Sequence, residues 1–263
     1  MCEQWLTLWP PGDGDARRMC VFAHYSADQQ LHASVVHQLH YLSALCRVVF
    51  VTQSRLAPAD HQLLQRYCTA VLPIPQDAKG RDLTSYAHGV QYIREQCNTA
   101  HLHWLWLVND SFYGPFCSLS VWQHTVQRTE QSGVAAWGLT NSFTPTYHIQ
   151  SYFVALNSTV VKDERFWQFL HRPWHRLHPI RDGELRLFSS AIAPKRTVAW
   201  RSARKHERFN PYTTDWRGTL ARAFILKKDA WKRFTGQHPD MLQRISRAGV
   251  LPAQWQVLRG DMT

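Results

Sequence analysis

The chain has 263 residues, of which 44% are apolar and 13% aromatic, so it can build a full hydrophobic core and is not an intrinsically disordered chain. Its formal net charge of +11 at pH 7 favours anionic partners such as nucleotide phosphates, nucleic acid or an acidic membrane face. No apolar run approaches the ~20 residues that span a bilayer.

The start of the chain and its cysteines indicate a reducing compartment. Glu3, Asp13 and Asp15 interrupt the region where a secretory leader would carry its apolar stretch. The six cysteines are widely spaced and form no CxxC pair, which argues against both a disulfide scaffold and a zinc site. We therefore expect a cytoplasmic protein with reduced, mostly buried thiols.

Short apolar runs alternate with amphipathic stretches after an N-terminal extension at 1–18. We expect strands and helices in the order strand 19–25, helix 27–45, strand 47–52, helix 57–67 and strand 71–74. Strands that alternate with helices in this way predict an α/β fold with a mostly parallel sheet covered by helices.

A polar loop at 76–82 precedes a predicted helix at 83–96. Lys79, Arg81 and Asp82 lie just before the start of this helix, where backbone amides and the helix dipole favour anions. The loop could hold the phosphate and ribose of a nucleotide. The alternative is that Asp82 only caps the helix.

The next strand, 105–108, ends in the polar triplet Asn109-Asp110-Ser111, followed by a turn at 113–115. In open α/β sheets, ligands bind outside the carboxyl ends of the strands. The triplet is therefore a candidate site. The alternative is that its residues only form the turn, since Asn, Asp, Ser and Gly dominate turns.

The second half of the chain continues the alternation. We expect a helix at 122–130, strands at 134–139 and 149–156, helices at 160–170 and 185–193, and an edge strand at 197–200. Residues 201–263 are basic, and we expect them to form a helical segment, with helices near 216–234 and 239–248, that packs on the same domain.

Two polar clusters interrupt this half. His171, His175 and His178 could suggest a metal site, but Pro173 would break the helix needed to align the first two. Asp182 and Glu184 open the helix at 185–193. They either complement its dipole or supply a general base. The chain has no G-x-G-x-x-G, Walker or G-x-S-x-G motif.

The order of several motifs resembles that of a known family. These are VFAHYSAD at 21–28, VVFVTQSRL at 48–56, KGRDLTSYAHGV at 79–90, LVNDSFYGPF at 107–116, WGLTNS at 137–142, HIQSYFVALN at 148–157, DGELRLFSSAI at 182–192, NPYTTDW at 210–216 and FILKKDAW at 224–231. In this order they resemble the rhamnan synthesis protein F family of bacterial polysaccharide glycosyltransferases.

The resemblance implies a GT-A-like, Rossmann-type catalytic domain over 19–200 that binds a nucleotide-sugar. It also assigns roles to single residues. The residues implied to bind the donor are His24, Tyr25, Lys79, Arg81, Asp82, Asn109, Asp110, Ser111 and Lys227. Asn109-Asp110-Ser111 takes the place of the DxD motif, so Asp110 would meet the diphosphate and is the candidate ligand of Mg²⁺ or Mn²⁺.

The remaining implied roles concern the acceptor and the sugar. Glu184 matches the general base best, with Asp182 as the second choice. His148, Gln150 and Tyr152 would face sugar hydroxyls, and strand alternation places Gln150 and Tyr152 on one side.

The leading hypothesis is a glycosyltransferase that moves a sugar, rhamnose by the family name, from a dTDP-, UDP- or GDP-sugar to a growing surface polysaccharide such as O-antigen or capsule. The acceptor could be lipid-diphosphate-linked, with the basic tail peripheral on the anionic inner face of the membrane. The alternative is a non-catalytic nucleotide-sugar or glycan-binding module. A nucleic-acid partner has only the net charge in its favour, and we expect none.

Overall fold

The computed structural model describes residues 6–7, 17–75, 82–170, 172, 182–183, 185–187, 192, 196–203 and 215–235. Within these residues, the helices are all too short or too polar to cross a membrane.

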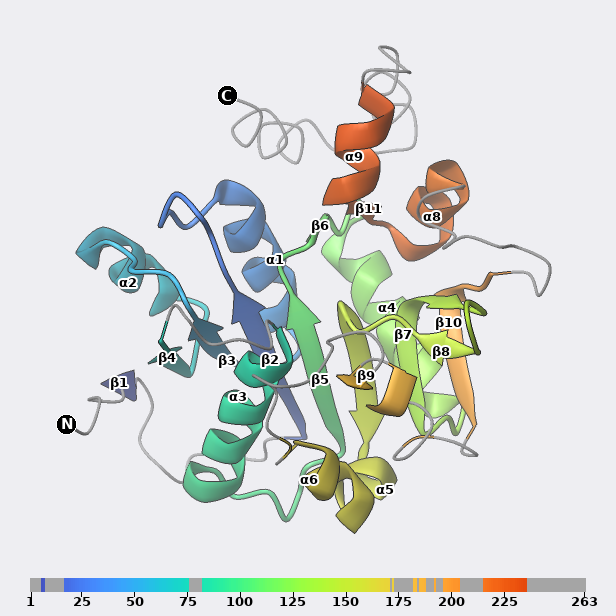
Figure 1. The fold of residues 1–263 in the computed structure, drawn as a ribbon, viewed down its shortest axis with the longest axis horizontal. Coiled ribbons are helices and arrows are strands. Elements are labelled where there is room, and N and C mark those ends of the chain that lie inside the picture. Colours follow the sequence, from blue (N-terminus) through green and yellow to red (C-terminus); the bar gives the residue numbers. More distant parts are fainter. Residues whose placement is uncertain are drawn as a thin grey trace.

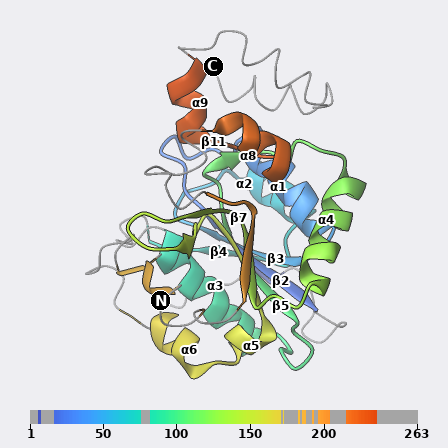
Figure 2. The same cartoon turned by 90° about the vertical axis from the view of Figure 1, so that its right-hand side faces the viewer.

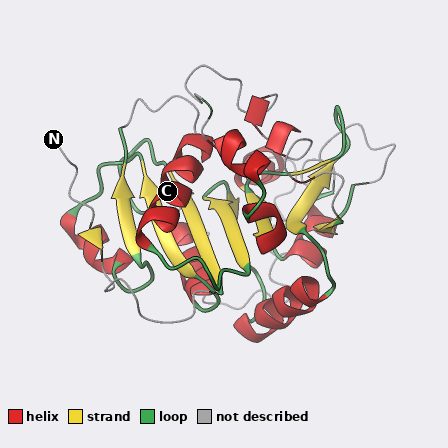
Figure 3. Ribbon diagram, turned by 90° about the horizontal axis from the view of Figure 1, so that it is seen from below, coloured by secondary structure: helices red, strands yellow, loops and turns green. Residues whose placement is uncertain are grey.

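A central sheet organises the fold. In the described part of the chain it has nine strands, which follow one another across the middle of the molecule (Figure 3). They are β1 (Leu6–Thr7), β2 (Arg18–His24), β3 (Arg47–Thr52), β4 (Ala70–Pro73), β5 (Trp104–Asn109), β7 (Ala136–Ser142), β8 (His148–Ile149), β9 (Phe153–Asn157) and β10 (Thr197–Arg201).

The strand order is β1-β4-β3-β2-β5-β9-β7-β10, and β8 pairs with β7 beside this path. Strands β4, β3, β2 and β5 are parallel, and β10 is parallel to β7. Strand β9 is antiparallel to both of its neighbours, β5 and β7, and β1 is antiparallel to β4. The predicted mostly parallel α/β sheet is thus confirmed, with β9 as an inserted antiparallel strand (Figure 1).

Helices cover both faces of the sheet. They are α1 (Ala33–Ser43), α2 (Pro58–Leu64), α3 (Asp82–Gln96), α4 (Leu119–Gln131), α5 (Ser158–Val161), α6 (Glu164–Leu170), α8 (Trp216–Ala223) and α9 (Lys228–Thr235). Seen along the sheet, α3, α5 and α6 lie on one face, and α1 and α4 lie on the other (Figure 2). Helices α8 and α9 lie over the carboxyl ends of the parallel strands.

The core has two layers because successive strand residues point to opposite faces. Val21 and Val49 belong to the layer beneath α3, whereas Phe22 and Phe50 belong to the layer beneath α1 and α4. The rings of Phe22 and Phe50 stack with centroids 5.6 Å apart. β-Branched and aromatic residues in these strands therefore fill both layers, as expected for a sheet covered on both faces.

Two predicted helices are shorter than expected. The predicted helix at 27–45 begins only at Ala33, because Ser26, Asp28 and His32 hydrogen-bond to one another in the preceding loop and Gln29 has φ 62°. The predicted helix at 160–170 is divided into α5 and α6.

Two predicted elements are divided in the structure. The predicted strand at 149–156 is divided into β8 and β9 by a turn at 151–152, and the register against β7 shifts by two residues between them. The predicted helix at 216–234 is also wrong as one element. Phe224 ends α8 in the left-handed conformation with φ 57°, and the short strand β11 (Leu226–Lys227) follows before α9.

The terminal segments meet the sheet at different places. Strand β1, in the predicted extension 1–18, pairs with β4, and Arg18 itself begins β2. Strand β11 pairs antiparallel with β6 (Phe112–Tyr113), so part of 215–235 packs against the loop that follows β5. The predicted helix at 239–248 lies outside the described residues. The described cysteines are free thiols, at 20, 46, 68, 97 and 117, as predicted.

Gly89 allows α3 to lie directly on the sheet. A Cβ at this position would overlap with the side chain of Val21 and lie 3.0 Å from Val51. We expect Gly89→Val to lower the free energy of unfolding by about 1–3 kcal/mol through overpacking, measured by urea denaturation. Gln91→Val, on the exposed side of the same helix, is the control for β-branching. Equal losses in the two variants would contradict this close packing.

Candidate functional site

The polar triplet after β5 is held by a side-chain amide. The Nδ2 of Asn109, the buried last residue of the strand, donates to Asp82 Oδ2 at 2.6 Å. Asn109 Oδ1 accepts from the backbone N–H of Ser111 at 3.0 Å and from the Ser111 hydroxyl at 2.5 Å. An amide can do both because it carries a donor and an acceptor. Asn109 therefore ties the first turn of α3 to the loop after β5.

A second set of contacts brings two lysines to this loop from the C-terminal segment. The backbone N–H of Lys228 donates to the Ser111 carbonyl at 3.1 Å. The ammonium of Lys227 donates to the Ser111 hydroxyl and lies 4.1 Å from the centroid of the Tyr152 ring. Both contacts follow from the pairing of β6 with β11, which brings two lysines next to the polar triplet.

Gly114 permits this pairing. Its φ is +113°, and a Cβ there would lie 2.7 Å from the carbonyl oxygen of Phe224. That same carbonyl accepts from the backbone N–H of Phe116 at 2.6 Å. The left-handed φ and the close backbone approach are both conditions that only glycine meets without strain.

Asp110 lies between these groups. Its carboxylate accepts a long hydrogen bond, 3.5 Å, from the backbone N–H of Tyr25. Burial, opposed by the Lys228 ammonium and aided by the nearby Asp82 carboxylate, raises the pKa of Asp110 to about 6. Folding therefore disfavours the ionised form of Asp110. Such perturbed pKa values are common at functional sites.

His24 and Tyr25 come from the neighbouring strand end. His24 is buried, and its Nδ1 lies 2.9 Å from the Thr52 hydroxyl. Burial, together with the nearby Lys228 and His32, lowers the pKa of His24 to about 3, which favours the neutral imidazole. Its Nε2 is buried with no hydrogen-bond partner among the described residues. The Tyr25 side chain is 54% exposed beside Asp110.

The three residues predicted to face the sugar are buried near the same loop. Thr140 links two of them, since its hydroxyl donates to Gln150 Oε1 at 2.5 Å and lies 2.6 Å from the Tyr152 hydroxyl. The predicted common side of Gln150 and Tyr152 is therefore observed, with both polar ends directed at Thr140. His148, in β8, pairs with Ser142 of β7, and its Nδ1 lies 2.8 Å from the Thr146 carbonyl.

The predicted acidic segment reaches the other side of Asp82. Asp182 is buried, its carbonyl accepts from Arg172 at 2.8 Å, and its carboxylate lies 3.9 Å from Arg186 Nε. Gly183 is so close to Leu83 that a Cβ would overlap with that side chain. Asp182 and Gly183 thus flank the start of α3. Lys79, Arg81 and Glu184 lie outside the described residues, as do His171, His175 and His178.

A divalent cation fits this donor set only in part. Asp82 is close enough to raise the pKa of the Asp110 carboxyl, a repulsion that a cation would relieve. The Asn109 oxygen is already committed to Ser111. The described residues contain no group of three His, Cys, Asp or Glu that could hold a metal. The carboxylates would therefore share a cation with ligand phosphates, as Mg²⁺ sites commonly do.

Lys228 and Thr140 contribute to this site but were not predicted from the sequence. Lys228 carries the charge that acts on both Asp110 and His24, and Thr140 orients Gln150 and Tyr152. The signal for Lys228 was its position next to Lys227. Strand β11 ends at Lys227 and α9 begins at Lys228, which brings both lysines to the same loop. Thr140 was assigned to a loop, so no signal marked its side chain as buried.

Comparisons with known proteins place this site in a family context. A family model described as Rhamnan synthesis protein F matches residues 48–183. The Uncharacterized protein y4gN of Sinorhizobium fredii (strain NBRC 101917 / NGR234) is 26% identical over 175 residues, which cover 64% of this chain and 44% of that relative. The chain therefore spans less than half of that relative's length.

Two solved structures are similar at low identity. The 4-diphosphocytidyl-2C-methyl-D-erythritolsynthase from Anaerococcus prevotii DSM 20548 is 10% identical with a TM-score of 0.44, over 79% of this chain and 95% of its own. Core-mannan synthase A from Aspergillus fumigatus, in a Mn/GDP form, is 9% identical with a TM-score of 0.39, over 76% of each chain. At these TM-scores the likenesses carry no argument about function.

Because the pKa of Asp110 is raised, we predict that replacing its carboxyl group stabilises the folded protein, relative to wild type, more at neutral than at acidic pH. An aspartate ionises near pH ~3.9 in an unfolded chain and Asp110 at about 6 in the folded one. Its contribution to stability is thus present below the lower value and is lost as the pH rises through the higher one. The free energy of unfolding of Asp110→Asn relative to wild type should increase by about 1–3 kcal/mol between pH 4 and pH 7.5.

This difference is measured by urea denaturation in EDTA at both pH values. Asp229→Asn, at an exposed position of α9, is the charge-matched control and should not show the increase. A constant difference between wild type and Asp110→Asn across this pH range would contradict the electrostatic description of the site.

Proposed function

The chain belongs to the rhamnan synthesis protein F family, and from this premise we propose that it is a GT-A-like, nucleotide-sugar-dependent glycosyltransferase of polysaccharide synthesis. The observation that carries the proposal is that the Lys227 ammonium and the Lys228 backbone N–H both donate to Ser111, in the loop that carries Asp110 at the carboxyl end of β5. Ligands of open α/β sheets bind at this edge, and a diphosphate needs positive charge there.

In this proposal the donor diphosphate lies against the loop after β5. Lys227 and Lys228 supply the cationic groups, and the Ser111 hydroxyl is already oriented by Asn109 and Lys227. The exposed Tyr25 ring is available for the nucleoside, because aromatic faces stack on bases of any identity. As the diphosphate leaves with growing negative charge, ammonium groups held in place stabilise it without reorganisation.

Asp110 and Asp82 are the residues that would hold Mg²⁺ or Mn²⁺. A bound cation would neutralise charge on the leaving diphosphate. Asn109 takes the place of the first acid of the DxD motif and instead fixes Asp82 at 2.6 Å. We infer that Asp82 thereby replaces the missing carboxylate, coming from a helix rather than from the motif itself.

For the chemical step we propose Glu184 as general base, with Asp182 as the second choice. The acceptor oxygen forms a bond to the anomeric carbon, the bond from that carbon to the diphosphate oxygen breaks, and the acceptor proton passes to the carboxylate. The position of Gly183 against Leu83 supports this role, since it brings the acidic segment to the residue next to Asp82. The acceptor would then approach from the side of α3.

His148, Gln150 and Tyr152 are buried, so we propose that they support the sugar site from beneath and do not face the sugar hydroxyls directly. Tyr152 also positions the Lys227 ammonium, because the cation lies over its ring. Rhamnose is the candidate sugar by the family's description. We further propose an acceptor that is a growing surface polysaccharide such as O-antigen or capsule, lipid-diphosphate-linked, with the basic residues of 201–263 facing an anionic membrane surface.

A non-catalytic nucleotide-sugar-binding module is the second candidate. It is favoured by Asn109, whose oxygen is committed to Ser111 and is not available to a cation. Incubation of the chain with UDP-, dTDP- and GDP-sugars, with Mn²⁺ or EDTA, separates the two. Release of nucleoside diphosphate that depends on an acceptor supports the transferase, whereas saturable donor binding without release supports the module.

Lys228→Met should lower kcat by about 10²-fold or more, because it removes a preorganised cation from the leaving diphosphate. Lys232→Met, at an exposed position four residues later on α9, removes the same charge away from the site and is the matched control. Steady-state assays of sugar transfer measure both. If the two variants retained the same activity, Lys228 would have no role at the donor.

Glu184→Gln should reduce turnover by about 10²–10⁴-fold and leave the Kd for the donor unchanged, because a general base acts on the acceptor. Calorimetry gives the donor Kd, and product mass spectrometry gives turnover. Glu164→Gln, an exposed acid at the start of α6, controls for the loss of one charge. If Glu184→Gln kept the wild-type turnover, the general base would instead be Asp182 or water.

A further inference from the structure

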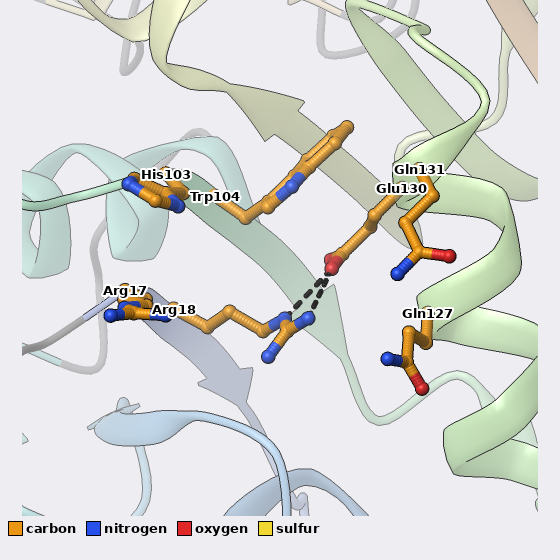
Figure 4. A pocket seen from close by; sticks show the side chains of 7 residues that line it. All are labelled: Arg17, Arg18, His103, Trp104, Gln127, Glu130 and Gln131. Carbon is orange, nitrogen blue, oxygen red and sulfur yellow. Dashed lines mark hydrogen bonds and ion pairs between the residues drawn. The ribbon is translucent and has the colours of Figure 1, made fainter.

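Two helices on one face of the sheet, α1 and α4, are tied to the rest of the fold at opposite ends of the strands. At the amino end, Arg18 of β2 donates to Glu130 Oε2 of α4 through Nε at 2.8 Å and through Nη2 at 2.6 Å. This ion pair lies in the wall of a cavity of about 360 Å³ (Figure 4). At the carboxyl end, α1 contacts the segment that follows β5, and these contacts bear on the donor site.

Three side chains of α1 donate hydrogen bonds to backbone carbonyls of residues 112–117. The pairs are Gln38 Nε2 with the Phe112 carbonyl at 2.5 Å, His37 Nε2 with the Pro115 carbonyl at 3.0 Å, and the Tyr41 hydroxyl with the Cys117 carbonyl at 2.5 Å. A carbonyl oxygen only accepts hydrogen bonds, so each side chain is the donor and the Nε2 of His37 carries a proton. Helix α1 therefore holds 112–117 at three points.

The Phe112 carbonyl lies on the side of β6 that faces away from β11. Phe112 pairs with Lys227, and the backbone N–H of Lys228 donates to the Ser111 carbonyl. The hydrogen bonds of an antiparallel pair flank every second pair of opposite residues, so Phe112 and Lys227 form a pair that exchanges none. The Phe112 carbonyl therefore points away from β11 and towards α1, where the Gln38 amide meets it.

The Gln38 amide is only partly satisfied. Gln38 is buried, and its Oε1 has no hydrogen-bond partner among the described residues. A buried polar atom without a partner disfavours the folded state. The next residue, Leu39, and Leu42 one turn later are buried in the core, where an apolar side chain has no such cost. What the amide adds over an apolar side chain is the hydrogen bond to Phe112.

Phe112 is connected to the groups that approach the proposed diphosphate. Its ring lies 5.7 Å from that of Tyr152, measured between centroids, and the Lys227 ammonium lies 4.1 Å from the centroid of the Tyr152 ring. The residue before it, Ser111, accepts from the same ammonium. A displacement of Phe112 would therefore move the hydroxyl, the ammonium and the aromatic ring relative to one another.

We propose that Gln38 is a positioning residue of the donor site. By holding the Phe112 carbonyl, it fixes β6 and thereby the Ser111 hydroxyl and the Lys227 ammonium against the donor diphosphate. The effect on catalysis rests on the proposed transferase function. The anchoring of β6 does not, and it can be measured without a donor.

Hydrogen exchange of the full chain, followed by mass spectrometry, tests the anchoring. Gln38→Met removes the donor at nearly constant length, and peptides covering 111–113 and 226–228 should exchange about tenfold faster than in wild type. The urea midpoint should stay within about 0.5 M of wild type, because the unpaired Oε1 is lost together with the hydrogen bond to Phe112. Gln62→Met, at an exposed position of α2, is the matched control and should exchange like wild type.

Gln38→Glu keeps the size of the side chain and makes its donor depend on pH. A neutral glutamic acid can donate its O–H to the Phe112 carbonyl, whereas an ionised one cannot, and burial favours the neutral form. Exchange in 111–113, expressed as a ratio to wild type at the same pH, should therefore rise between pH 5 and pH 9. A ratio that does not change with pH would contradict a role for the donated proton.

Turnover separates positioning from a structural role. In sugar-transfer assays Gln38→Met should lower kcat by about tenfold or more, and Gln62→Met should keep the wild-type value. The inference is overturned if Gln38→Met exchanges like Gln62→Met, if its exchange rises throughout the chain with a lowered urea midpoint, or if its kcat is unchanged. If wild type itself transfers no sugar, the proposed function fails, and the exchange data still accept or reject the anchoring of β6.

Discussion

The antiparallel pairing of β6 with β11 is the constraint on which the candidate site depends. It joins segments more than 100 residues apart, and its register sets Leu226 opposite Tyr113 and Lys227 opposite Phe112. Without it, the loop after β5 would present only an amide, a carboxylate and a hydroxyl. With it, the Lys227 ammonium donates to the Ser111 hydroxyl, the Lys228 backbone N–H donates to the Ser111 carbonyl, and the Lys228 ammonium acts on Asp110. Gly114 makes the approach possible, because any side chain there would meet the Phe224 carbonyl.

The charged groups at this loop are not fully compensated when the protein folds. Asp110 loses hydration on folding and lies near Asp82, so its ionised form is disfavoured, and Lys228 offsets this only in part. Burial lowers the pKa of His24, and the same ammonium lowers it too. A site of this kind gives up folding stability for the ability to bind a multiply charged ligand, which is the usual relation between stability and function at polar sites. Asn109 holds the arrangement in place because its amide has no charge to add to the repulsion.

The sequence predicted those parts of the fold that are fixed by local pattern. The strands at 47–52 and 105–108 are β-branched or apolar runs whose burial on both faces follows from their composition, and the polar residues at their ends mark the edge where a site was expected. It did not predict the antiparallel insertion of β9, the division of 149–156 or the break at Phe224. The place of β9 and the break at Phe224 depend on partners remote in sequence: β5 for β9, and β6 for β11. Lys228 was missed for the same reason, since its role arises from pairing rather than from spacing.

The account rests on the claim that a nucleoside diphosphate binds between the loop after β5 and the start of α9. Photo-crosslinking tests this most directly, with a nucleoside diphosphate that carries a benzophenone on its β-phosphate and with the adducts located by mass spectrometry. The account predicts adducts within 109–113 or 226–228 that the unmodified nucleotide suppresses by competition. Competable adducts found only around Arg47 and Arg66, at the opposite edge of the sheet, would contradict it.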